Sequence, residues 1–197
     1  MDFLLGVGRS TGAADLKEKT ERAKKVLEKT ESDAEILNKL EVEGDDDPLY
    51  KQVLRGEAVK RMAVPAVAAT TEHALQDFTD LLDKNPRSMK RFVNAYGVER
   101  ALRTIEGTNV GLDQLARWTI VLLRWPIMAG LLRSDPKLVD KIGSDPGYTV
   151  PENARSLFTD DEIKQVIAGT KRAHGKPLDA DAIRQCCGNF TSTSGQP

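Results

Sequence analysis

Residues 85–94, Asn85-Pro86-Arg87-Ser88-Met89-Lys90-Arg91-Phe92-Val93-Asn94, combine a helix-start signal with basic and apolar residues at helical spacing. Asn85 suits an N-cap, because its side-chain oxygen can accept a hydrogen bond from an amide of the first turn. Pro86 then falls at the first helical position, where no amide hydrogen is needed. The polar residues that follow recur at i, i+3, i+4 and i+7, which predicts one polar helix face: Arg87, Lys90, Arg91 and Asn94.

Arg87 falls in the first turn of this helix, where the helix dipole favours anions over cations. The sequence therefore predicts an anionic neighbour for the Arg87 guanidinium. The alternative is a structural role, in which Arg87 bonds carbonyls at a helix C-terminus, or Asp80 or Asp83, and fixes how two helices meet. For Lys90 and Arg91 the alternative is a solvated helix face.

The composition is that of a globular protein. The chain has 197 residues, of which 30% are charged and 40% hydrophobic, and its formal net charge is -1. This length fits one domain, or one domain with an extended appendage. Because positive charge is not in excess, bulk attraction to nucleic acid or anionic lipid is not expected.

Two further features bear on the cellular location. The longest apolar stretch, residues 118–132, is interrupted by Arg124 and Pro126, so we expect no membrane span. The only cysteines are adjacent, Cys186 and Cys187, so there is no disulfide framework. A reducing cytoplasm is the expected location.

The fold is predicted to be all-α, because no segment shows sustained alternation of polar and apolar residues. We expect an irregular multi-helix bundle with an extended, charged N-terminal helix. The predicted organisation has four parts: a flexible lead-in (1–14), a charged helical arm or appendage (15–64), a helical bundle (65–190) and a flexible tail (191–197).

Apolar residues recur at roughly heptad spacing within residues 15–41, and Thr30 to Asp33 mark a plausible break. An amphipathic helix that packs one side on the body explains this pattern. A self-associating coiled coil, giving a homo-oligomer through residues 15–41, is the alternative.

Three positions punctuate the predicted bundle. Gly97 is expected to end or kink the Asn-Pro-Arg helix, and Val98 to Ile105 to continue as another turn or two. Pro126 is expected to kink the helix from residue 112 to 132 or to start a new one. Residues 143–156 are expected to form a loop or a small peripheral element.

Catalytic and metal-binding patterns are missing from the sequence. The glycines of residues 6–12 lack the lysine of a phosphate-binding loop. His73 and His174 are too few and too far apart to form a zinc site with Cys186 and Cys187. We therefore expect no catalysis, no metal and no cofactor in this chain alone.

Two motifs resemble the helical C-terminal region of KAP-family P-loop NTPases. Residues 85–94 resemble the family's Asn-Pro-Arg-x-x-Lys-Arg-hydrophobic-hydrophobic-Asn signature. Residues 115–126, which run from Leu115-Ala116-Arg117-Trp118 to Arg124-Trp125-Pro126, resemble the Leu-Ala … Leu … Arg-Trp-Pro helix that follows it. The resemblance covers roughly residues 70–190.

The resemblance implies a helical lid or regulatory domain of a P-loop NTPase that couples nucleotide state to a partner or to assembly. KAP proteins are often membrane-associated. Carried over, Arg87 would be a nucleotide-sensor candidate with a planar fork of donors for phosphate, and Lys90 and Arg91 would be weaker neighbours. Other residues would shape the motifs: Asn85, Pro86, Asn94, Trp118, Arg124, Trp125 and Pro126.

The sequence departs from that family in lacking the Walker A and Walker B elements. ATP and Mg²⁺ would therefore enter only with a P-loop core supplied by the same or another chain. A stand-alone helical protein-interaction module is the alternative function, with residues 15–41 as its partner surface. A third function, nucleic-acid binding through Lys90, Arg91, Arg100 and Arg103, is disfavoured by the balanced charge.

Overall fold

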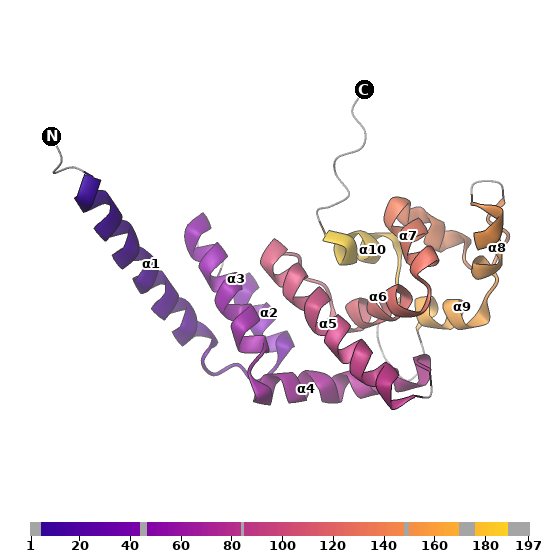
Figure 1. Ribbon diagram of the computed structural model, residues 1–197, viewed down its shortest axis with the longest axis horizontal. Coiled ribbons are helices and arrows are strands. Elements are labelled where there is room, and N and C mark those ends of the chain that lie inside the picture. Colours follow the sequence, from indigo (N-terminus) through magenta and orange to yellow (C-terminus); the bar gives the residue numbers. More distant parts are fainter. Residues whose placement is uncertain (1–4, 44–46, 84, 148–149, 170–175, 189–197) are drawn as a thin grey trace, which may run out of the picture. The chain divides into compact units, whose positions relative to one another are not determined.

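The computed structural model describes residues 5–43, 47–83, 85–147, 150–169 and 176–188. These ranges contain helices and connecting turns but no strand, so the fold is all-α, as predicted. The chain divides into two units, Met1–Thr71 (unit 1) and Glu72–Pro197 (unit 2). The helices are labelled in Figure 1, and each unit is described by itself.

Unit 1 contains three helices, α1 (Leu5–Leu27), α2 (Asp33–Val42) and α3 (Pro48–Met62), and most of α4 (Pro65–Leu75). Their buried apolar side chains form one cluster: Ala23, Leu27, Ile36, Tyr50, Leu54, Ala58 and Val67. The predicted break between α1 and α2 is confirmed. There Ser32 Oγ accepts a hydrogen bond from Glu35 N at 3.3 Å, and Arg61 donates two bonds to the Thr30 carbonyl.

The start of unit 1 and its boundary differ from the predictions. Helix α1 begins at Leu5, so residues 5–14 are helical rather than a loose lead-in. Extending a helix that already exists needs no new nucleation, which outweighs the poor propensity of the local glycines. The boundary lies after Thr71 rather than before residue 65, because Val67 of α4 packs into the unit 1 cluster. Residues 44–46 and 191–197 lie outside the described residues.

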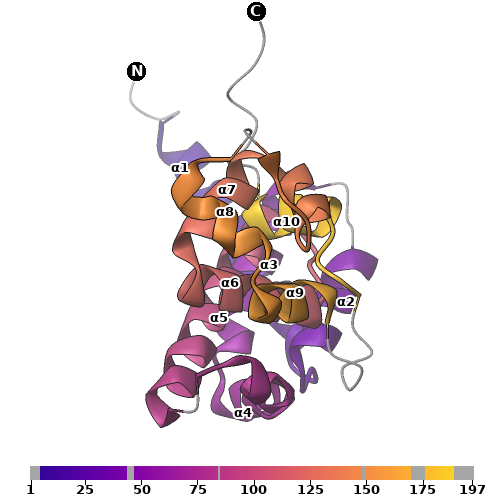
Figure 2. The same cartoon turned by 90° about the vertical axis from the view of Figure 1, so that its right-hand side faces the viewer.

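Unit 2 begins with η1 (Gln76–Leu81, a 3₁₀ helix) and the long helix α5 (Pro86–Glu106). Helices α6 (Leu112–Arg124) and α7 (Pro126–Ser134), the 3₁₀ helix η2 (Pro136–Lys141) and the short helices α8 (Glu152–Phe158), α9 (Asp161–Ala168) and α10 (Ala180–Cys187) follow. Figure 2 views this unit from the side of α8 and α9.

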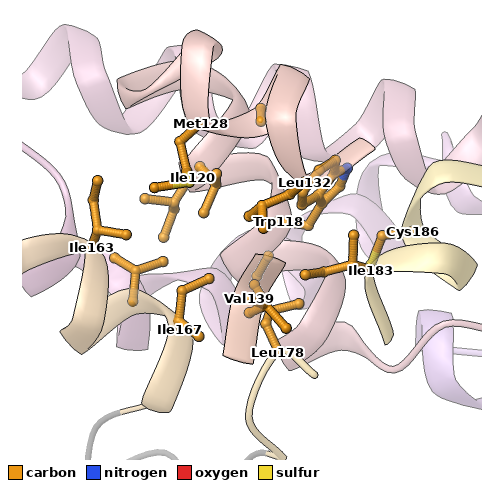
Figure 3. Close-up of a cluster of buried hydrophobic side chains, with 14 of the residues drawn as sticks. Trp118, Ile120, Met128, Leu132, Val139, Ile163, Ile167, Leu178, Ile183 and Cys186 are labelled. Atoms are coloured by element: carbon orange, nitrogen blue, oxygen red, sulfur yellow. The ribbon is translucent and has the colours of Figure 1, made fainter. Parts of the chain in front are cut away.

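Helix α6 lies at the centre of unit 2, in contact with α5, α7, α9 and α10. All its residues from Leu115 to Val121 are buried. Figure 3 shows the surrounding core, in which Trp118 of α6 lies among side chains of α7, η2, α9 and α10. Trp118 is a fully buried core residue. Trp125 is only partly buried, because it occupies the junction at which α6 ends and α7 begins.

The prediction that Gly97 ends or kinks the Asn-Pro-Arg helix was wrong, whereas the predicted continuation from Val98 to Ile105 is confirmed. Gly97 lies inside α5, which continues to Glu106 and ends at Gly107 with φ +76°. Thr108 N then bonds the Arg103 carbonyl at 2.9 Å, which closes the helix end. Within residues 143–156, expected to form a loop or a small peripheral element, the short helix α8 begins without a side-chain cap; it buries Ala154 and Phe158.

Pro126 starts a new helix, one of the two outcomes that the sequence left open. Asp160 caps α9, because its side chain accepts hydrogen bonds from Glu162 N at 2.8 Å and Ile163 N at 3.1 Å. Among the described helices, none has the length and apolar character needed to cross a bilayer.

Candidate interaction face of helix α5

Helix α5 starts as the sequence predicts. Asn85 has extended backbone angles and its Oδ1 accepts a hydrogen bond from Arg87 N at 2.9 Å, while Pro86 occupies the first helical position. The helix then runs for 21 residues without interruption. Every residue that the sequence placed on the polar face is therefore held on one rigid element.

The inner face of α5 is unusual because arginines follow the aromatic residues into the interior. Phe92 and Tyr96 are buried, and Arg100 and Arg103 one and two turns later are only 2% and 4% exposed. Arg100 donates two bonds to Tyr96 Oη, at 3.1 and 2.7 Å, and one to the Val110 carbonyl at 2.7 Å. These bonds tie the end of α5 to the loop that leads into α6.

Arg103 is held by carboxylates of its own helix. Its Nη1 lies 3.0 Å from Glu106 Oε2 and its Nη2 lies 3.9 Å from Glu99 Oε2. The closer contact is an ion pair rather than an aligned hydrogen bond, since neither atom has a hydrogen-bond partner by geometry. Gly188, after α10, packs directly on this guanidinium, and a Cβ there would lie 1.9 Å from Arg103 Nη1.

The outer face of α5 has the opposite character. Seven exposed residues at helical spacing define it: Arg87, Lys90, Arg91, Asn94, Val98, Leu102 and Ile105. We call Arg87, Lys90 and Arg91 its basic half, and Val98, Leu102 and Ile105 its aliphatic half. The three aliphatic side chains are 60%, 42% and 57% exposed, respectively. The face carries no acidic residue, because Glu99 and Glu106 point toward Arg103.

The cations of the basic half have no partner among the described residues. No hydrogen bond or ion pair of the Arg87, Lys90 or Arg91 side chain occurs there, and all three residues are exposed. The described structure thus supplies neither the anionic neighbour predicted for Arg87 nor the alternative bond to Asp80 or Asp83.

Arg124 makes the contacts that the structural alternative assigned to Arg87. Its Nη1 donates to the Leu81 carbonyl at the end of η1 at 2.8 Å. Its Nη2 pairs with Glu162 Oε2 and lies 3.5 Å from Asp83 Oδ1, and its guanidinium lies over the Trp125 ring. The Arg124-Trp125-Pro126 motif therefore joins η1, the α6–α7 junction and the first turn of α9. A polar cleft of about 260 Å³ adjoins it.

Arg117 of the second motif is structural as well. It is fully buried, and its Nη1 donates to the Lys176 carbonyl at 2.9 Å. Burial lowers the pKa of its guanidinium, and the charge of Asp113 acts in the other direction. Gly169, with φ +80°, lies against it, and a Cβ there would meet Nη1 at 2.4 Å.

The two cysteines and the metal-ligating side chains of the described residues remain to be placed. Cys186 and Cys187 are free and buried, and burial raises the pKa of both thiols, so neither has the thiolate character of a nucleophile. Within the described residues no group of three or more His, Cys, Asp or Glu side chains could hold a metal ion. His174 lies outside the described residues.

The structure also removes half of the proposed nucleic-acid contacts. Of the four cations considered, Arg100 and Arg103 are buried, and only Lys90 and Arg91 face outward. The sequence pattern did not reveal the aliphatic half of the face. Its signal is present, since Val98, Leu102 and Ile105 continue the phase of Arg87 and Arg91, but the end or kink expected at Gly97 interrupts that phase.

Comparison of the chain with protein-family models, with curated proteins and with solved structures gives no match. The resemblance to the KAP family therefore stays a prediction. The outer face of α5 is the candidate functional site on structural grounds.

Proposed function

We propose that this chain is a non-catalytic helical interaction module that docks on another protein through the outer face of α5. One observation carries the proposal: within two turns of α5, Arg100 and Arg103 are buried while Val98, Leu102 and Ile105 are exposed. Single exposed aliphatic residues are ordinary, whereas a contiguous stripe marks a surface that another molecule covers.

The exposed stripe of α5 is a better docking surface than residues 15–41. In unit 1 the apolar residues Ala23, Leu27 and Ile36 are already buried in the unit's own cluster. Of the residues at heptad spacing, Ala23 is buried, Val26 and Leu40 pack partly buried against the same cluster, and Leu16 is 45% exposed. The partner surface that we propose is accordingly on unit 2.

Site-specific photocrosslinking tests this proposal. A benzophenone side chain at Val98 should give a discrete higher-mass adduct in cells, and the same probe at Ile127 of α7 should not. Ile127 is the matched control, since it is 56% exposed and lies in the same unit but outside the face. Leu102→Glu should abolish the Val98 adduct. Equal adducts at both positions, or none at Val98, would contradict the proposal.

A second candidate function is the lid or regulatory domain of a KAP-like P-loop NTPase. The observation that favours it is the Arg87 guanidinium, which is exposed, lies on the first turn of α5 and has no partner in the described structure. An exposed guanidinium without such a partner can donate parallel hydrogen bonds to the phosphates of a nucleotide held by a separate core. ATP and Mg²⁺ would then belong to that core, and we propose the cytoplasm as the location because both thiols are free.

The lid function is tested by adding a KAP-family P-loop core to the full chain. The chain should change the ATPase rate of the core, and Arg87→Ala should reduce that change by at least about tenfold. Lys137→Ala, an exposed cation outside the face, is the control. If Arg87→Ala and wild type alter the rate equally, the sensor role of Arg87 is wrong.

A further inference from the structure

We propose that the partner presents an amphipathic helix that lies antiparallel to α5, with an aliphatic first half on Val98, Leu102 and Ile105 and an acidic second half on Arg87, Lys90 and Arg91. This inference rests on the proposed function and names the chemistry of the partner. Figure 1 labels α5, the helix that carries this face.

The spacing on α5 indicates a helix as the occupant. Val98, Leu102 and Ile105 lie at i, i+4 and i+7, the ridge that packs into the groove of a second helix. From Arg87 to Ile105 the face extends for about 27 Å, at 1.5 Å for each residue. A partner helix of about five turns covers it completely.

The charges indicate which end of that helix is acidic. Three exposed cations share the first two turns of α5, and no acidic residue of the face neutralises them. Carboxylates on the partner neutralise these three cations and fix the register of the two helices. The aliphatic half, in contrast, has no charge to pair and requires apolar side chains.

The antiparallel direction follows from the helix dipoles. The N-terminus of α5 carries partial positive charge beside Arg87, and the C-terminus of a helix carries partial negative charge. If the C-terminal half of the partner helix is acidic, its carboxylates and the negative end of its dipole both lie at the basic half of α5. Acidic residues near its own C-terminus weaken that helix in isolation, so docking should also order it.

A second copy of α5 is not complementary to the outer face of α5. A parallel pair would place Arg87, Lys90 and Arg91 against their own counterparts. An antiparallel pair would place these cations on the aliphatic half of the other copy and leave them unpaired. The distribution of charge along α5 thus favours a different protein.

Synthetic helical peptides of one composition test the inference with the full chain. The first has three leucines at i, i+3 and i+7, followed at the same spacing by three glutamates. The second has the glutamates first, and the third has lysines in place of glutamates. In fluorescence anisotropy we expect the first peptide to bind at least tenfold more tightly than the second, and the third not to bind.

Variants of the chain assign this binding to the face. Ile105→Ser and Arg91→Glu should each weaken the first peptide at least tenfold, whereas the matched controls Ile127→Ser and Lys137→Glu should not. The double variant Arg87→Glu/Arg91→Glu should gain binding of the lysine peptide. Binding of the lysine peptide would show that the double variant is folded and has changed its specificity, because an unfolded variant would bind neither peptide.

Each of the following results would overturn the inference. Equal or tighter binding of the glutamate-first peptide would exclude the antiparallel direction, and equal binding of the lysine peptide would exclude charge recognition. Dimerisation in light scattering that Ile105→Ser abolishes would make a second copy the occupant. Binding to vesicles of phosphatidylserine and phosphatidylcholine without peptide binding would indicate a membrane surface. If all peptides fail while the Val98 adduct persists, only this inference is wrong; loss of both removes the proposed function too.

Discussion

Three arginines of unit 2 lie inside the protein, and each has a specific contact there. Arg100 bonds Tyr96 and the Val110 carbonyl, Arg103 pairs with two glutamates, and Arg117 bonds the Lys176 carbonyl. Burial of a guanidinium is costly unless its donors are paired, so these contacts decide whether the interior tolerates the charge. Because Arg100 and Arg103 occupy the inner face of α5, the aliphatic residues Val98, Leu102 and Ile105 of that helix face outward.

Replacing Arg100 by methionine should lower the free energy of unfolding of unit 2 by about 2 kcal/mol. The variant keeps the length of the side chain but leaves the Tyr96 hydroxyl and the Val110 carbonyl without their donor. Urea unfolding followed by tryptophan fluorescence is the measurement, since both tryptophans lie in unit 2. Arg91→Met, on the exposed face, should change stability by less than about 0.5 kcal/mol. Equal effects of the two variants would contradict the role given to Arg100.

The buried thiols should make unit 2 less stable in alkaline solution. Burial raises the pKa of Cys186 and Cys187 above the ordinary value of about 8.5 that a thiol has in an unfolded chain. At a pH between the pKa of a thiol in the unfolded chain and its higher pKa in the folded chain, the unfolded chain releases a proton that the folded chain retains. The contribution of the thiols to stability is therefore complete below about pH 8 and falls as the pH rises, and for Cys186 the loss at pH 9.5 is up to about 1.4 kcal/mol.

The measurement for this prediction is the difference in unfolding free energy between pH 7.5 and 9.5 under reducing conditions. Cys186→Ala should show a smaller difference than wild type, whatever its stability at pH 7.5. An unchanged difference would show that Cys186 does not retain its proton in the folded state.

At the scale of elements, α5 combines a start set by local sequence with an end and two faces set by packing. Asn85 and Pro86 begin the helix locally, whereas Gly97 fails to end it. A glycine in a helix interior costs only about 1 kcal/mol relative to alanine, which the burial of Phe92 and Tyr96 outweighs. The candidate face exists because the helix continues past Gly97.

Gly97→Ala should therefore stabilise unit 2, by about 0.5–1 kcal/mol in urea unfolding, because no atom lies within 4 Å of the added Cβ. Gly188→Ala is the opposite case. Its φ of +68° disfavours alanine, and the Cβ would collide with the Arg103 guanidinium and Glu106, so we expect a loss of about 2 kcal/mol or more. Destabilisation by Gly97→Ala would mean that α5 does bend or end near that residue.

At the scale of the whole molecule, the chain buries two separate apolar clusters. One contains residues from Ala23 to Val67 in unit 1 and the other residues from Leu75 to Cys187 in unit 2. A cluster that shares no buried residue with another can unfold on its own. The site proposed on α5 depends on the second cluster alone.

A fragment of residues 72–197 should accordingly fold without unit 1. It should unfold in one cooperative transition, at the urea concentration at which tryptophan fluorescence changes in the full chain. Far-UV circular dichroism of the full chain should show a further transition that fluorescence does not report. A fragment without helical signal, or without a cooperative transition, would show that unit 2 needs unit 1.

Much of the fold could be predicted from local signals. The caps of α5 and α10, the break before α2 and the new helix at Pro126 all depend on residues within a turn of one another. Helix α8 could be predicted only as a loop or a small peripheral element, because it has no side-chain cap and its buried residues Ala154 and Phe158 depend on the packing of unit 2. The basic half of the candidate site was predicted by residue number, and the aliphatic half was missed.

The sequence by itself determined the all-α class, the start of α5 and the shared phase of Arg87, Lys90, Arg91 and Asn94, because capping and helical periodicity act over a few residues. Only the tertiary structure decided which side of α5 is buried. Arginines and aliphatic residues alternate in its second half, and hydrophobicity alone would turn Val98, Leu102 and Ile105 inward. The Val110 carbonyl instead accepts a bond from Arg100, and Gly188 leaves room for the Arg103 guanidinium, so both arginines lie inside and the aliphatic residues stay exposed.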